Sequence, residues 1–164
     1  MLWQQGVDAN LVIVGKQGWM MEALAEKLRT HPERERRLFW LAGVSDEMLL
    51  KLYRACAALL AASVGEGFGL PLIEAAQHGL PIIARSLPVF REVGGEHAYY
   101  FEAADAGALA ATLAQWLALH AEGRAPQSAA LPWLTWKDST AQLVQALTQA
   151  HWYRQLAPST TGAP

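Results

Sequence analysis

The chain has a single cysteine, Cys56, among its 164 residues, so it cannot form an internal disulfide. This cysteine content suits a reducing compartment, and we expect a cytoplasmic protein. Neither sign of charge dominates, because 13 lysines and arginines stand against 15 aspartates and glutamates, a formal net charge of −2. The balance argues against a basic surface for nucleic acid or an anionic membrane.

Long hydrophobic runs are also missing. The longest apolar stretch, Ala55 to Val64, is too short to span a bilayer. Met1–Asn10 lacks the basic head and apolar core of a signal peptide. The five histidines show no metal-ligand spacing, so we expect no metal site and no cofactor. What remains is a chain of 52% apolar residues, long enough for one domain with a hydrophobic core.

Short apolar runs alternate with amphipathic stretches, which is typical of a parallel sheet between helix layers. The expected strands are Asn10–Val14, Leu38–Leu41, Ala58–Ala62, Pro81–Ala84 and Ala98–Phe101. The expected helices are Trp19–Arg29, Asp46–Ala55, Pro71–His78, Pro88–Val93, Ala106–Ala121 and Trp136–Leu156. The sequence thus predicts an α/β fold, a Rossmann-like open parallel sheet with helices on both faces. One domain covers residues 1–157, and residues 158–164 form a disordered tail.

Ligands of open α/β sheets bind beyond the carboxyl ends of the strands, where the loop Ser63–Pro71 lies. Gly67 and Gly69 allow the main chain to turn tightly and approach a ligand. Free amides at the start of the following helix favour an anion such as a diphosphate. Glu66 and Glu74, on either side of these amides, would then meet the neutral hydroxyls of a sugar and a ribose.

Each of these features also has a purely structural interpretation. Glycine-rich turns between a strand and a helix are common, and acidic residues near a helix start are usually solvated caps. Lys16 lies at the ligand-binding edge beside Gly15, but it is equally well explained as a surface lysine. Arg85 and Arg91 follow a later strand, and arginines on such loops are more often solvated.

The segment EGFGLPLIEA, Glu66–Ala75, is very similar to the signature of family 4 retaining glycosyltransferases with the GT-B fold. Further segments resemble the same family in the expected order, from about Asn10 to Trp152. They are LVIVGKQGW (Leu11–Trp19), FWLAGVSDEMLLKLYRACAALL (Phe39–Leu60), HGLPIIARSLPVFREVGG (His78–Gly95) and the tryptophan that opens the last helix, Trp136. The resemblance is to the C-terminal, donor-binding domain of these enzymes.

The resemblance implies a role for each matching residue. Glu74 would accept hydrogen bonds from the donor ribose. Glu66 would be the catalytic residue and would hold hydroxyls of the donor sugar. The segment from Gly67 through the amides of Phe68, Gly69 and Leu70 would meet the sugar and the departing diphosphate. The loop Gly43, Val44 and Ser45 would lie beside the nucleobase. Gly15 and Lys16 would also lie at the donor, where Lys16 could add positive charge near the nucleotide.

Two parts of the family pattern have no counterpart in the sequence. One is the N-terminal acceptor domain, through which any peripheral membrane association would run. The other is the first strand of the donor domain and its loop, whose arginine and lysine clamp the diphosphate in the family. We therefore expect the strand Asn10–Val14 to face an absent neighbour. The isolated chain is expected to be inactive, and to be marginally folded or paired with another polypeptide.

The resemblance favours a hexosyltransferase that uses a nucleotide-sugar and a glycan or lipid-linked acceptor. The turn GKQGW is similar to mannosyl and rhamnosyl transferases of surface-polysaccharide assembly, so GDP-mannose is the favoured donor and a UDP-sugar the alternative. A non-catalytic module that binds a nucleotide or nucleotide-sugar is the second hypothesis. A dinucleotide-binding domain is disfavoured because no GxGxxG follows the first strand.

Overall fold

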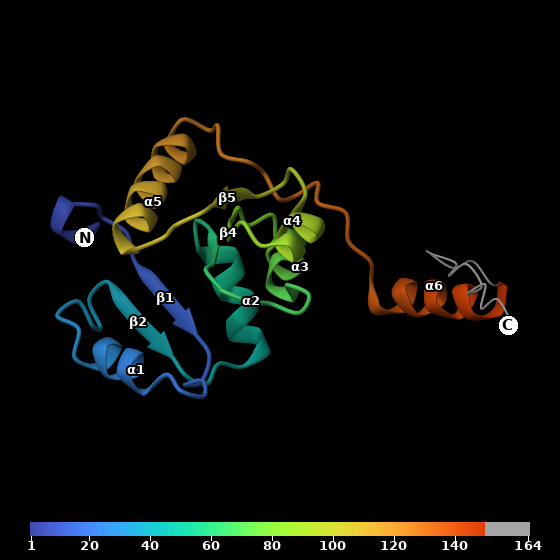
Figure 1. Ribbon diagram of the computed structural model, residues 1–164, viewed down its shortest axis with the longest axis horizontal. Coiled ribbons are helices and arrows are strands. Elements are labelled where there is room, and N and C mark those ends of the chain that lie inside the picture. The colour runs from blue at the N-terminus through green and yellow to red at the C-terminus, as the bar shows by residue number, and fades with distance from the viewer. Residues whose placement is uncertain (150–164) are drawn as a thin grey trace, which may run out of the picture. The chain divides into compact units, whose positions relative to one another are not determined.

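A computed structural model of the chain describes residues 1–149 (Figure 1). The predicted tail at 158–164 and the end of the predicted last helix lie outside these residues. The strands are β1 (Leu11–Val14), β2 (Leu38–Leu41), β3 (Leu59–Ala61), β4 (Ile82–Arg85) and β5 (Tyr99–Phe101). The helices are η1 (Trp3–Gln5), α1 (Glu22–Arg29), α2 (Asp46–Ala55), α3 (Leu70–Gln77), α4 (Pro88–Gly94), α5 (Ala106–Ala121) and α6 (Trp136–Gln149). Met1–Leu131 form one compact unit, and the described residues from Pro132 onward belong to a second.

All strand pairs are parallel, as predicted, but the strands form two ladders instead of one continuous sheet. In the first ladder β1 pairs with β2, with Leu11 opposite Leu38. In the second, β4 lies between β3 and β5, with Ile83 opposite both Leu60 and Tyr99. Within residues 1–149, β1 therefore pairs with β2 alone.

The core of the first unit is built on the two faces of β4, whose residues are almost fully buried. Ile82 and Ala84 pack in a cluster with residues of α2, α3 and α4, including Leu72 and Phe90. Ile83 points to the opposite face, where it packs in a second cluster with Trp116 of α5. Because successive strand residues face opposite sides, the apolar residues Ile82, Ile83 and Ala84 fit between two helix layers.

Local signals explain most helix boundaries, with one correction. Ser45 caps α2 as predicted, because its hydroxyl accepts a hydrogen bond from the Met48 amide at 3.2 Å. The helix predicted from Trp19 instead begins at Glu22. Met20 has a φ of 56°, a left-handed conformation that cannot continue a right-handed helix.

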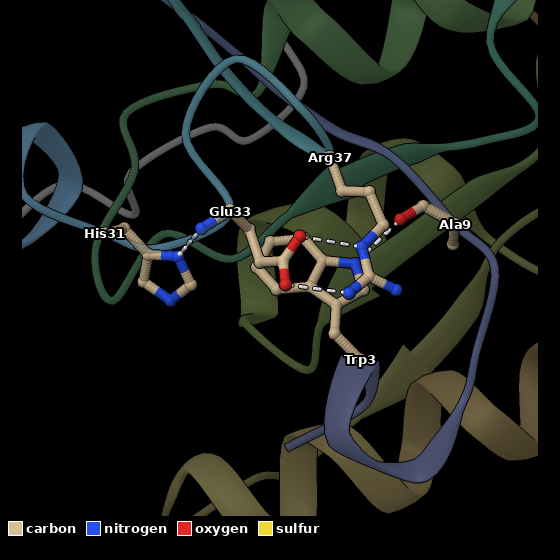
Figure 2. Close-up of polar contacts among 5 residues, drawn as sticks. All are labelled: Trp3, Ala9, His31, Glu33 and Arg37. Carbon is tan, nitrogen blue, oxygen red and sulfur yellow. Dashed lines mark hydrogen bonds and ion pairs between the residues drawn. The ribbon is translucent and has the colours of Figure 1, made fainter.

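The amino-terminal turn η1 is anchored to the loop that follows α1 (Figure 2). The Trp3 indole donates to the carbonyl of Ala9 at 2.7 Å, and the Arg37 guanidinium lies 5.6 Å from the Trp3 ring centroid. Arg37 also donates two hydrogen bonds to Glu33, at 2.9 and 2.8 Å, while His31 packs edge-on against Trp3. This ion pair lowers the pKa of the Glu33 carboxyl below its usual range. The cluster fixes the chain just before β1.

The second unit contains α6, in which no residue is buried. Thr135 and Asp138 cap its start, because the Asp138 amide donates to the Thr135 hydroxyl at 3.1 Å and that hydroxyl donates to the Asp138 carboxylate at 2.6 Å. Among the helices of residues 1–149, none is long and apolar enough to cross a membrane.

Candidate functional site

The loop Ser63–Gly69 leads from β3 into α3 and depends on Gly69 for its shape. Gly69 has a φ of 87°, a left-handed conformation that costs side-chain-bearing residues energy. A Cβ atom at this position would lie 2.9 Å from Cε1 of Phe90. Since Phe90 is itself buried in the core, it has little room to move away. The sequence thus brings the loop main chain directly against the core.

The amides at the start of α3 are available to a ligand. Phe68, Gly69 and Leu70 have no hydrogen-bond acceptor for their amides among residues 1–149, and Pro71 has no N–H. Together with the dipole of α3, such amides attract an anionic group. The free amides predicted at the start of this helix are present, and binding of an anion by them stays a prediction.

Glu66 is exposed at the entrance of the loop, as a ligand-binding carboxylate must be. Its Oε1 accepts a hydrogen bond from the Gly67 amide at 3.2 Å, and its Oε2 accepts one from the Ser63 hydroxyl at 3.4 Å. Both partners belong to the same loop, so Glu66 also helps to hold the loop in shape. The structural and the ligand-binding interpretations of Glu66 are compatible with this geometry.

Glu74 is held by a residue that the sequence analysis missed. The Tyr53 hydroxyl, on α2, donates a hydrogen bond of 2.6 Å to Oε2 of Glu74 on α3. Burial raises the pKa of the Tyr53 phenol, and the hydrogen bond and charge of Glu74 raise it further, so the phenol remains a donor. The Glu74 carboxylate is thereby oriented, and its Oε1 has no partner among the described residues.

A sequence signal for Tyr53 existed. The residue lies on the apolar stripe of α2 with Leu49, which packs against the same core cluster. A tyrosine on a buried stripe needs a partner for its hydroxyl, but nothing in the sequence identifies Glu74 as that partner. The His78 ring stacks on the Tyr53 ring with centroids 5.7 Å apart, which further limits its motion.

Gly15 and Lys16 follow directly after β1. The Gly15 carbonyl accepts a hydrogen bond from the Trp40 indole at 2.8 Å. Lys16 lines a cavity of about 460 Å³ with residues of α1 and β2, including Arg29. No residue of the stretch 66–74 lines this cavity. A role for Lys16 beside the nucleotide stays a prediction.

The loop of Gly43, Val44 and Ser45 follows β2 and starts α2. The Ser45 hydroxyl is already engaged as the helix cap, whereas Gly43 is exposed and Val44 half-buried. This loop and the Glu74 site are connected through α2, because Ser45 begins the helix whose last turn carries Tyr53.

Arg85 is anchored at the carboxyl end of β4 instead of being solvated. Its guanidinium donates to the carbonyls of Ala62, at 3.4 Å, and Ala103, at 3.2 Å, and lies 5.2 Å from the centroid of the Phe101 ring. Ala62 is the residue that precedes Ser63. A fixed positive charge therefore lies beside the start of the glycine loop.

Comparison with known proteins identifies relatives of this sequence. Residues 1–130 match the family described as glycosyl transferases group 1. The serotype-specific mannosyltransferase WbdA of Escherichia coli is 51% identical over 146 residues, 89% of this chain and 18% of that protein. The O-antigen chain mannosyltransferase RfbU of Salmonella typhimurium is 36% identical over 92 residues, 56% of this chain and 26% of that protein. The chain thus spans only a small part of the curated relatives that it matches.

Solved structures show the same architecture. Sucrose-phosphate synthase from Thermosynechococcus elongatus superposes with a TM-score of 0.70 at 23% identity, over 91% of this chain and 40% of that one. The pneumococcal O-GlcNAc transferase GtfA, solved with UDP and GlcNAc, superposes with a TM-score of 0.59 at 25% identity, over 76% and 25% of the two chains. These likenesses confirm the predicted Rossmann-like α/β fold.

Proposed function

The chain belongs to the glycosyl transferases group 1, and from this premise we propose that it is the donor-binding part of a retaining mannosyltransferase. In this proposal it is the C-terminal domain of a GT-B enzyme of family 4. The observation that carries the proposal is the loop Glu66–Leu70, with its available amides, beside the oriented carboxylate of Glu74. Such a pair of features fits a ligand with an anionic centre and hydroxyl-bearing rings on both sides.

In this proposal, Glu66 and Glu74 contact different parts of the donor. The diphosphate would lie against the amides of Phe68, Gly69 and Leu70, where developing negative charge on the leaving group is stabilised. The ribose hydroxyls would donate to Oε1 of Glu74, since Tyr53 already occupies Oε2. The sugar hydroxyls would donate to Glu66. Arg85, fixed beside the loop, adds a positive charge that favours the diphosphate.

The names of the relatives support mannose as the transferred sugar. WbdA and RfbU are described as mannosyltransferases, and the latter acts on an O-antigen chain by its description. We accordingly propose GDP-mannose as the donor and a glycan or lipid-linked glycan as the acceptor, in the cytoplasm. UDP, which is bound in the GtfA structure, points to a UDP-sugar as the alternative donor.

The remaining parts of the reaction would come from outside residues 1–164. We propose that an acceptor domain and the cations of the family's diphosphate clamp lie there, so that the isolated chain binds donor without transfer. The alternative is a module that binds nucleotide-sugars without catalysis in any context. A transfer assay with the full-length protein and a glycan acceptor separates the two, because only the transferase consumes GDP-mannose in proportion to acceptor.

Calorimetry with GDP and GDP-mannose tests the assignment of the glutamates. Glu74→Gln should weaken both ligands by roughly 10- to 100-fold, because a charged acceptor of ribose hydroxyls is lost. Glu66→Gln should weaken GDP-mannose but leave GDP nearly unchanged, since only the sugar contacts it. Glu96→Gln is the matched control. Glu96 is exposed and lies before the amino end of β5, whereas Glu66 and Glu74 follow the carboxyl end of β3. Wild-type affinity of Glu74→Gln for GDP would refute the ribose assignment.

A further inference from the structure

The cavity between α1 and β2 contains neither the glycine loop nor the two glutamates. Its volume of about 460 Å³ lies within the range of roughly 300–1,000 Å³ that ligand sites occupy. Its lining follows β2 from Leu38 to Ala42 and continues over Leu28 and Arg29 of α1, which lies alongside the strand (Figure 1). Five residues of extended chain span about 13 Å, so the cavity is a groove along one strand.

The free side of β2 presents a backbone donor and a backbone acceptor at this groove. On the paired side, the Leu11 amide donates to the Arg37 carbonyl at 2.8 Å, and the Gly15 amide donates to the Leu41 carbonyl at 3.0 Å. Backbone groups of successive strand residues point to opposite sides, so the amide and the carbonyl of Trp40 point away from β1. Neither of these two groups has a hydrogen-bond partner among residues 1–149.

The turn before β2 pairs with the first residue on this side of the strand and with no other. The Leu38 amide donates to the Glu33 carbonyl, and the Leu38 carbonyl accepts from the Glu35 amide, both at 2.9 Å. Glu35 has a φ of 59°, a left-handed conformation that costs a residue with a side chain energy. Trp40 is left open, although the strand sequence LFWL carries no charge or proline of the kind that usually protects a free edge.

Positive charge surrounds the groove. Three cations line it, Lys16, Arg29 and Arg34, together with a single anion, Glu35. Glu35 pairs with Arg34 at 3.0 Å, and the Arg29 guanidinium lies 5.4 Å from the centroid of the Trp40 ring. The excess of positive charge is local, because the whole chain has a formal net charge of −2. Such an excess attracts an acidic ligand.

We propose that the groove binds an extended acidic segment of a partner protein, which adds to the free side of β2 as a further strand. The backbone of the segment accepts a hydrogen bond from the Trp40 amide and donates one to the Trp40 carbonyl, the mode in which a peptide extends an existing sheet. Acidic side chains at alternate positions of the segment lie on the face that α1 covers, beside Arg29.

Two other occupants fit these observations less well. A small anion offers acceptors only, so the Trp40 carbonyl would keep no donor and would lie beside a negative charge. A peptide backbone offers both a donor and an acceptor. A second copy of this chain would bring the same three cations to the groove if the two β2 edges paired, and like charges would then repel one another.

The test measures binding of a labelled peptide of alternating valine and glutamate to the full-length protein by fluorescence anisotropy. Binding should saturate, and the same peptide with lysine in place of glutamate should not bind. Only one alternate set of peptide amides faces β2, so N-methylation of that set should weaken binding at least about tenfold and methylation of the other set should change it little. Equal effects of the two sets would overturn the proposal, because charge alone would then hold the peptide.

Substitutions in the protein locate the peptide. Arg34→Gln should weaken binding roughly two- to fivefold, as expected for loss of one partly exposed charge pair, and the Arg34 side chain is 53% exposed, so the fold should tolerate the change. Arg54→Gln is the matched control, because Arg54 is exposed on α2 and does not line the groove. Equal losses from Arg34→Gln and Arg54→Gln would place the peptide elsewhere and overturn the proposal.

Hydrogen exchange and competition complete the test. Exchange of the Trp40 amide should slow at least about tenfold at saturating peptide. Slowing that rises with protein concentration in the absence of peptide would overturn the proposal, because a second copy would then occupy the edge. GDP-mannose should leave peptide binding unchanged, since no residue of the stretch 66–74 lines the groove. Displacement of the peptide by GDP-mannose would assign the groove to the donor instead.

Discussion

Replacing Gly69 by alanine adds one methyl group at the point where the loop contacts the core. The left-handed φ of 87° costs an alanine about 1–2 kcal/mol relative to glycine. The new Cβ would lie 2.9 Å from Cε1 and 3.0 Å from Cδ1 of Phe90, and overpacking of a core contact costs about 1–3 kcal/mol. We expect Gly69→Ala to lower the free energy of unfolding by about 2–5 kcal/mol in urea denaturation.

Gly67→Ala is the matched control, because a Cβ at Gly67 meets no atom within 4 Å. We expect it to change the free energy of unfolding by no more than about 0.5 kcal/mol. The two substitutions add the same methyl group to the same loop two residues apart. Equal effects of Gly67→Ala and Gly69→Ala would refute the reasoning.

A double-mutant cycle with Phe90→Leu separates the backbone strain from the clash. Leucine lacks the ring atoms that the new Cβ would meet, so Gly69→Ala should cost about 1–3 kcal/mol less in this background. The backbone strain, which does not involve Phe90, should remain. A coupling energy near zero would show that the requirement for glycine at position 69 does not come from the contact with Phe90.

Three further predictions concern residues around the loop and the amino-terminal cluster. Tyr53→Phe should weaken GDP binding several-fold, because Glu74 loses the hydrogen bond that orients it. The raised pKa of Tyr53 means that its contribution to stability is full below about pH 10 and is lost as the pH rises further. Between pH 8 and pH 11, Tyr53→Phe should therefore lose less stability than wild type in urea titrations. The lowered pKa of Glu33 means that its carboxylate stabilises the fold above about pH 4.3, and that this contribution is lost as the pH falls. Glu33→Gln should therefore make the free energy of unfolding depend less on pH in this acidic range. An unchanged dependence would show that the pair with Arg37 adds nothing. Ser45→Ala should cost about 1 kcal/mol in thermal unfolding as the cap of α2 is lost, whereas Ser45→Asn should cost little.

The alternation of strands and helices was predictable because each element depends mainly on its own residues. β4 reads as a buried strand since Ile82, Ile83 and Ala84 are apolar on both faces. The start of α2 follows from Ser45 and the acidic turn after it. The predicted start of α1 was wrong by three residues, because Met20 adopts a left-handed conformation and no glycine in the sequence indicates one at this position.

The details of the site depend on contacts between distant segments. The glycine loop was predictable because its residues are consecutive, but the bond from Tyr53 to Glu74 joins side chains 21 positions apart on different helices. The placement of Lys16 depends on how α1 packs against β2, which the strand-end rule does not specify. Arg85 illustrates the same limit. It donates to the carbonyls of Ala62, just after β3, and Ala103, just after β5, and the sequence alone does not show that these two segments lie beside the end of β4.

Helix α2 connects the two ladders and also holds the residue that orients Glu74. The helix begins at Asp46, after the cap Ser45 that follows the first ladder, and ends at Ala55, just before β3 of the second. Its last turn carries Tyr53, which donates to Glu74 on α3. The direction of the Glu74 carboxylate therefore depends on how α2 is held between the two ladders.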